Sequence, residues 1–96
     1  MKPSDLLVQH RSAIRQIALR HGMRSVSVFG SVLKGLDSEG SDLDLLVEPT
    51  PTTSTFDIGG VQFEVSELLG IPVDVLTPDA LPMAFRSRVM AEAVRL

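Results

Sequence analysis

The sequence predicts an α/β (α+β) domain in which a small β-sheet of three or more strands is flanked by about four helices. Two observations support this prediction. Segments with apolar residues at helical spacing alternate along the chain with short runs rich in valine and leucine. The chain also has 96 residues, which is enough for one modest hydrophobic core. We therefore expect one domain over residues 1–96.

The composition excludes several classes of protein. The formal net charge is -3 and the nine basic residues are scattered along the sequence, so direct nucleic-acid binding is not expected. The absence of cysteine excludes disulfides and thiolate metal sites, and it suits a cytoplasmic protein. The charged N-terminus is not a signal peptide, and no apolar run is long enough to span a membrane. The short chain is compatible with a homo- or hetero-oligomer.

The first half of the chain predicts one long helix and two strands. Gly22 is expected to end the helix, and the alternation of polar and apolar residues in "SVSVF" is typical of a half-buried strand. Pro49 is expected to stop the second strand. In order, the expected elements are a helix capped by Ser4 and running to His21, a strand over 25–29, one or two helical turns over 32–35, a polar loop over 37–41 and a strand over 42–48.

The second half predicts two helices and one strand. A helix with apolar residues on one face is expected to end before Gly70. The expected elements are a Pro/Thr-rich loop over 49–55, that helix, a strand over 72–77 and a last helix over 83–95. Apolar side chains at helical spacing in the last helix are expected to face inward; these are Phe85, Val89, Met90, Ala93 and Val94.

Two carboxylates interrupt the apolar run of the second strand. Asp42 and Asp44 are two residues apart, so they project from the same face, whereas Leu43 and Leu45 project from the other. Two adjacent carboxylates raise each other's pKa unless a cation compensates their charge. Mg²⁺ prefers such oxygen ligands. A solvent-exposed strand end is the alternative reading of this pair.

Asp74 stands alone between two valines in the third expected strand, where an unpaired charge is costly. If the second and third strands are neighbours, Asp74 completes a three-carboxylate cluster with Asp42 and Asp44. Such a cluster could hold one or two metal ions. Alternatively, Asp74 is a charge at a strand edge or pairs with Arg86 or Arg88, which we otherwise expect to be solvated.

The Gly30-Ser31 pair supplies a candidate anion site. Glycine lets the backbone approach a ligand closely, and Ser31 would begin a short helix whose free N–H groups suit a phosphate. Lys34 adds a positive charge nearby. A simple turn is the alternative reading. The loop acids Asp37 and Glu39 are expected to be solvated.

These residues together resemble a known signature. "GS", then ten residues, then "DLD", resembles the motif of the DNA polymerase β-like nucleotidyltransferase superfamily. The resemblance extends to "ALRHGMRSVSVFGS", "DIGGVQFEVSELLGIPVDVLTPDAL" and "FRSRVMAEAVRL", so it covers nearly the whole chain. In this respect the chain is similar to the minimal nucleotidyltransferases, which are antitoxin partners of HEPN-domain toxins. The resemblance implies the mixed sheet of the polymerase β-like fold.

The resemblance also implies roles for individual residues. Gly30 and Ser31 match the phosphate-binding pair, and Lys34 stands where many relatives have arginine. Arginine offers a planar fork for phosphate that lysine lacks. Asp42 and Asp44 match the metal-binding pair, and Asp74 matches the third carboxylate, which helps to activate the acceptor hydroxyl in catalytic members. One or two Mg²⁺ ions and ATP are the implied cofactor and substrate.

Three functions follow as hypotheses. The first is an antitoxin enzyme of a type VII-like toxin–antitoxin pair, which transfers AMP from ATP to a hydroxyl, expected to be a tyrosine, on a HEPN toxin. The second is a non-catalytic antitoxin that occludes its toxin. The third is a subunit of a small-molecule nucleotidyltransferase. No base-reading residue stands out in the sequence.

Overall fold

The computed structural model describes all 96 residues and contains a four-stranded mixed sheet. Its elements are α1 (Pro3–Arg20), β1 (Ser25–Phe29), β2 (Leu43–Glu48), α2 (Thr55–Leu69), β3 (Val73–Leu76), the 3₁₀ helix η1 (Pro78–Ala80), α3 (Met83–Glu92) and β4 (Val94–Arg95). The strand order is β3-β2-β1-β4; β2 and β3 run parallel, and the other two pairs are antiparallel. The predicted fold class is therefore confirmed, with one strand more than the three that were located in the sequence.

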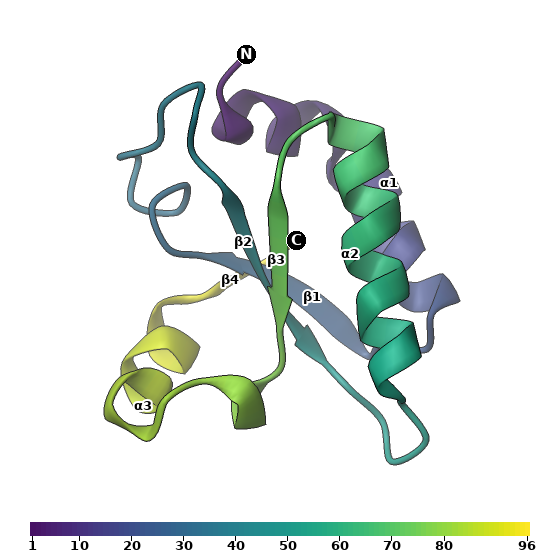
Figure 1. The fold of residues 1–96 in the computed structure, drawn as a ribbon. Coiled ribbons are helices and arrows are strands. Elements are labelled where there is room, and N and C mark those ends of the chain that lie inside the picture. The colour runs from purple at the N-terminus through teal and green to yellow at the C-terminus, as the bar shows by residue number, and fades with distance from the viewer.

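The helices occupy both sides of the sheet. Figure 1 shows α1 and α2 together against one side and α3 on the other. Alternation along the strands places Val26, Leu45 and Val75 on the side of α1 and α2, where they are buried. Other members of the same core include Ile14, Ala18, Leu43, Val47, Val61, Val65 and Val73. The opposite face of the sheet is less covered, and the acidic side chains lie on it.

The termini of α1 and α2 are fixed by local polar contacts. The α2 cap is formed by Ser54 and Asp57, and α2 ends at Gly70 in the left-handed conformation, as predicted. Gly22, with φ 81°, follows the C-terminus of α1. Arg20 and His21 both contact the carboxylate of Glu64 on α2, which ties the two helices together.

Asp37 has a structural role that the sequence did not reveal. Helix α1 begins at Pro3 rather than after Ser4, and the backbone N–H of Ser4 donates a hydrogen bond of 2.9 Å to Asp37 Oδ2. Asp37 is buried, with 7% of its surface exposed, and this backbone bond lowers the pKa of its carboxyl group. The expectation that Asp37 is solvated was wrong, whereas its neighbour Glu39 is exposed as expected.

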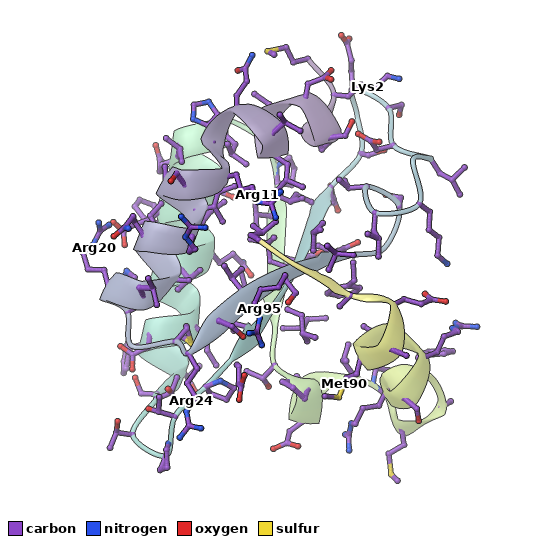
Figure 2. The ribbon with its side chains drawn as sticks, turned by 180° about the vertical axis from the view of Figure 1, so that it is seen from behind. Lys2, Arg11, Arg20, Arg24, Met90 and Arg95 are labelled. Carbon is purple, nitrogen blue, oxygen red and sulfur yellow. The ribbon has the colours of Figure 1, made fainter.

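The C-terminal segment differs most from the prediction. Helix α3 ends at Glu92, and β4 then pairs with β1. The backbone N–H of Leu96 donates to the carbonyl of Val26 (3.0 Å), and its side chain joins the core. Figure 2, which shows the fold from behind, shows Arg11 of α1 beside β4; its guanidinium donates to the Arg95 carbonyl (3.1 Å). Pairing with the free edge of β1 therefore replaces the last helical turn.

Helix α3 contributes no buried residue. Phe85 and Met90, which were expected to face inward, are 47% and 51% exposed, and Val94 is 49% exposed in β4. The expectation of inward packing was wrong for these three residues, because cavities lie between α3 and the sheet, whereas Val89 and Ala93 are half-buried. None of the helices in this structure is both long enough and apolar enough to cross a membrane.

Candidate active site

The Gly30-Ser31 pair forms a tight turn at the end of β1 instead of the expected helical turns. Gly30 has φ 78°, a conformation that favours glycine. The N–H of Lys34 donates to the Gly30 carbonyl (3.2 Å) and that of Leu36 to the Ser31 carbonyl (2.9 Å). The backbone N–H groups of residues 31–33 have no partner within the chain. Successive free N–H groups of this kind can form an anion-binding nest without a helix.

Gly30 lies directly against Asp44. A Cβ atom at position 30 would overlap Oδ2 of Asp44 and would be 3.2 Å from its Cγ. Only glycine, whose side chain is a hydrogen atom, fits at position 30 unless the Asp44 carboxylate moves. The turn after β1 and the carboxylate of β2 therefore belong to one site, because Phe29 and Asp44 are register partners in the antiparallel pair.

Asp44 and Asp74 are register partners on the parallel strands β2 and β3. Partners in register project from the same face of a sheet, and Asp42 precedes Asp44 by two residues. Burial raises the pKa of the Asp44 carboxyl group, and the charges of Asp74 and Asp42 raise it further. The structure thus places the three predicted carboxylates in one electrostatic neighbourhood.

No positive group compensates these three carboxylates. None of them makes an ion pair, so Asp74 does not pair with Arg86 or Arg88. Carboxylate oxygens suit Mg²⁺, and the uncompensated charge fits a cation. As the side chains stand, however, no three acidic or histidine residues lie close enough to hold one metal ion. Strand register therefore brings Asp44 and Asp74 together, and Asp42 lies just before β2, but the three side chains do not form a finished coordination shell.

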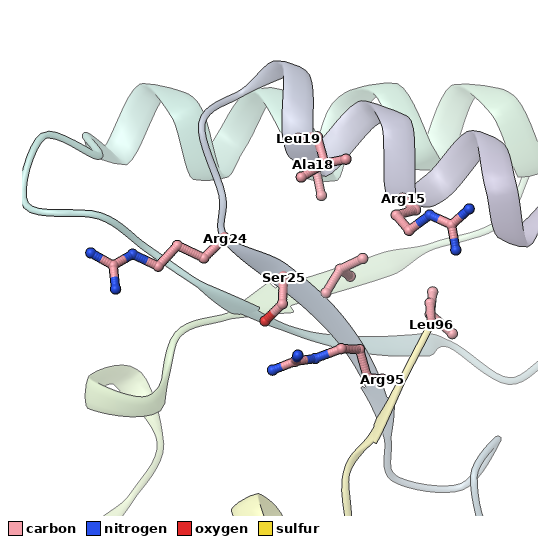
Figure 3. Close-up of a pocket in the computed structure, with 8 residues that line it drawn as sticks. Arg15, Ala18, Leu19, Arg24, Ser25, Arg95 and Leu96 are labelled. Carbon is pink, nitrogen blue, oxygen red and sulfur yellow. The ribbon is translucent and has the colours of Figure 1, made fainter.

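A cavity of about 350 Å³ adjoins the Gly30 turn. It lies between α3 and the ends of β1 and β3, and we call it the α3 cavity. Its lining includes Gly30, Lys34, Leu76, Phe85, Arg88, Val89 and Glu92. Its volume is within the ~300–1,000 Å³ range of ligand pockets. Two other depressions, of about 100 and 440 Å³, contain none of the predicted site residues. Figure 3 shows the smaller one, where Arg15 and Arg24 point away from each other.

The two arginines of α3 have different environments. Arg86 donates to the carbonyls of Leu81 (3.1 Å) and Asp79 (3.2 Å), so it stabilises the turn before α3. Arg88 lines the α3 cavity with Lys34, and its guanidinium lies 5.7 Å from the ring centroid of Phe85. Sequence reasoning placed Phe85 and Val89 on one face of this helix but did not add Arg88 and Glu92 to the group. Its signal was the spacing of Phe85, Arg88, Val89 and Glu92, which places them on one side of a helix.

The comparisons with known proteins identify the family. Residues 8–96 match the model of the nucleotidyltransferase domain, so the chain belongs to the nucleotidyltransferase family of enzymes. A relative from Methanocaldococcus jannaschii that is named as a protein adenylyltransferase is 38% identical over 78 residues, which cover 81% of this chain and 84% of the relative. Protein adenylyltransferase MntA from Thermococcus cleftensis is 30% identical over 90 residues, covering 94% and 88% of the two chains.

Solved structures agree with this assignment. A structure described as a minimal nucleotidyltransferase has a TM-score of 0.87 and 35% identity, and the match covers 97% of this chain and 95% of the other. A toxin–antitoxin structure with AMP-PNP has a TM-score of 0.67 and 16% identity, covering 97% and 71% of the two chains. At that identity the second likeness concerns the fold alone.

Proposed function

We propose that this nucleotidyltransferase is a Mg²⁺-dependent protein adenylyltransferase and the antitoxin of a toxin–antitoxin pair. It transfers AMP from ATP to a hydroxyl group, that of a tyrosine, on a HEPN-domain toxin. The observation that carries the proposal is the close approach of Gly30 to Asp44, because it joins the turn with free backbone N–H groups to the acidic residues. The protein adenylyltransferases among the relatives support the donor and the type of acceptor.

The residues divide into three roles in this proposal. The free N–H groups after Gly30 and the Ser31 hydroxyl bind phosphate oxygens, and Lys34 adds positive charge at the same edge. Asp42 and Asp44 would hold Mg²⁺, and Asp74 would be the third ligand once the side chains have rearranged around the ion. When bound, the ion supplies neutralisation of the triphosphate charge.

The reaction forms one bond and breaks one bond. The acceptor oxygen bonds to the α-phosphorus of ATP, the bond from that phosphorus to the β-phosphate oxygen breaks, and pyrophosphate leaves. Asp74 accepts the proton of the acceptor hydroxyl. Its exposed position on the open face of the sheet leaves room for a protein acceptor. Most of the rate enhancement in such a transfer comes from positioning and electrostatics.

The test uses the product of the gene beside the one for this chain, which the proposal expects to be the toxin, and ATP in Mg²⁺ buffer. Wild-type protein is expected to add the mass of one or more AMP groups to the toxin, measured by intact-mass spectrometry. Asp42→Asn is expected to abolish the addition and leave the circular dichroism spectrum unchanged, because Asp42 is exposed. Full transfer by this variant would refute the assignment of the carboxylates.

A second candidate is the non-catalytic antitoxin that occludes its toxin. The observation in its favour is that the acidic side chains do not form a ready metal site. It predicts that Asp42→Asn inhibits the toxin as well as the wild type does when ATP is absent, and that the toxin mass never changes.

A further inference from the structure

The α3 cavity is the one depression that touches the predicted phosphate turn. Gly30 and Lys34 are among its lining residues, whereas the other two depressions contain neither. The nucleoside of a nucleotide is covalently joined to its phosphates, so it has to lie near them. The cavity is therefore within reach of the nucleoside of a nucleotide whose phosphates lie at Gly30.

One side of α3 supplies the aromatic and charged side chains that line the cavity. Phe85, Arg88, Val89 and Glu92 follow the i, i+3, i+4, i+7 spacing, so they project from the same side of the helix into the cavity. Phe85 is 47% exposed although it is aromatic, and the Arg88 guanidinium is 5.7 Å from its ring centroid. Leu76, from the end of β3, adds an apolar wall. A flat aromatic ring with apolar neighbours suits a planar heterocycle.

Glu92 is the only acidic residue that lines the cavity. An ionised carboxylate accepts hydrogen bonds and cannot donate them, so it favours a ligand with an N–H group. Adenine offers an exocyclic amino group, as guanine and cytosine do, whereas the base of purine riboside has no N–H donor at all.

We propose that the α3 cavity binds the base of the nucleoside triphosphate, with Phe85 stacking on the base and Glu92 accepting a hydrogen bond from its exocyclic amino group. This inference rests on the proposed function, since it assumes that the phosphates occupy the Gly30 turn. It assigns Phe85 to affinity for the nucleoside, and Glu92 to the preference for a base with an exocyclic amino group. Neither residue is required for phosphate binding.

The test compares ATP, purine riboside triphosphate and inorganic tripolyphosphate as ligands, measured by titration calorimetry in Mg²⁺ buffer. Phe85→Ala is expected to weaken ATP binding about tenfold, the size of one stacked base, without changing tripolyphosphate binding. Phe85→Tyr keeps the ring and should restore ATP binding. Glu92→Ala is expected to remove most of a roughly tenfold preference for ATP over purine riboside triphosphate.

Phe63→Ala is the matched control, because Phe63 is an exposed phenylalanine on α2 that does not line the cavity. It should leave all three affinities unchanged. If wild-type protein binds ATP and tripolyphosphate but Phe85→Ala weakens neither, or both equally, the base site is wrong and the proposed function stands. If wild-type protein binds neither ligand, the proposed function fails and the base site fails with it.

Discussion

Gly30 and Asp44 occupy adjoining space, so that a Cβ atom at residue 30 would overlap the Asp44 carboxylate. Gly30 also has φ 78°, which disfavours other residues. Two independent constraints therefore act on one position: the shape of the turn and the room for the acid. The two constraints can be separated, because the same turn contains Gly35, which has φ 70° but where a Cβ atom would meet nothing within 4 Å beyond its chain neighbours.

Gly30→Ala is expected to abolish nucleotidyl transfer, while Gly35→Ala is expected to retain most of it. Both variants introduce backbone strain of about 1–2 kcal/mol, because an L side chain disfavours positive φ. Only Gly30→Ala also displaces the Asp44 carboxylate. Transfer rates and urea denaturation of both variants check the prediction. Equal activity losses in the two would show that strain alone matters.

Asp74→Asn is expected to stabilise the metal-free protein while removing its activity. Asp44 and Asp74 are like charges in register, so neutralising one relieves a repulsion of about 0.5 kcal/mol. The measurement is thermal unfolding in the presence of EDTA. Asp79→Asn, an acid of η1 outside the cluster, should leave the midpoint unchanged.

In Mg²⁺ the comparison between the wild type and Asp74→Asn should change, because the wild type is expected to gain more thermal stability from the ion. A ligand that binds the folded state raises its stability, so Mg²⁺ should raise the Tm of the wild type more than that of Asp74→Asn. Equal responses of the two proteins to Mg²⁺ would argue against Asp74 as a ligand.

The Asp37 contact with α1 predicts a pH dependence of stability. Because the Ser4 N–H lowers the folded-state pKa of Asp37, the ionised form stabilises the folded protein. This contribution is fully present above the unfolded-state pKa of about 3.9 and is lost as the pH falls through the lower folded-state value. Asp37→Asn should therefore be less stable than the wild type at pH 7, with the difference shrinking below about pH 4. Glu39 lies two residues from Asp37 but is exposed. Glu39→Gln should therefore have the same stability as the wild type in urea denaturation at either pH.

The core of β2 should be intolerant of cavities. Leu45 of β2 is fully buried in the hydrophobic core. Leu45→Ala is therefore expected to lower the free energy of unfolding by about 3 kcal/mol. Leu36 is 74% exposed, so Leu36→Ala should change it by less than about 0.5 kcal/mol. Denaturant midpoints of the two variants provide the comparison; similar losses would contradict the assignment of the core.

The elements that the sequence predicted correctly are those whose signals lie within a few residues of one another. The strand over 25–29 was located to the residue, because its alternation and the following glycine are both local signals. The register of Asp44 with Asp74 could be expected only if β2 and β3 were neighbours, and the structure confirms that they are. The roles of these residues in catalysis stay predictions.

The parts that could not be predicted depend on distant partners. Asp37 looked solvated because the N–H that it binds belongs to Ser4, 33 residues away. The last residues looked helical because their apolar spacing continues that of α3, whereas an unpaired edge of β1 makes them a strand. The inward packing of Phe85 failed for a similar reason, since spacing reveals a helix face but not what the face meets.

The parallel pairing of β2 with β3 has a consequence during synthesis. Asp44 and Asp74 come from two strands separated by the whole of α2, and a parallel pair cannot be closed by a tight turn. A growing polypeptide that has left the ribosome only as far as α2 holds two of the three acidic residues, Asp42 and Asp44, and lacks Asp74. We therefore expect the nascent chain to be unable to act on ATP until β3 has paired with β2.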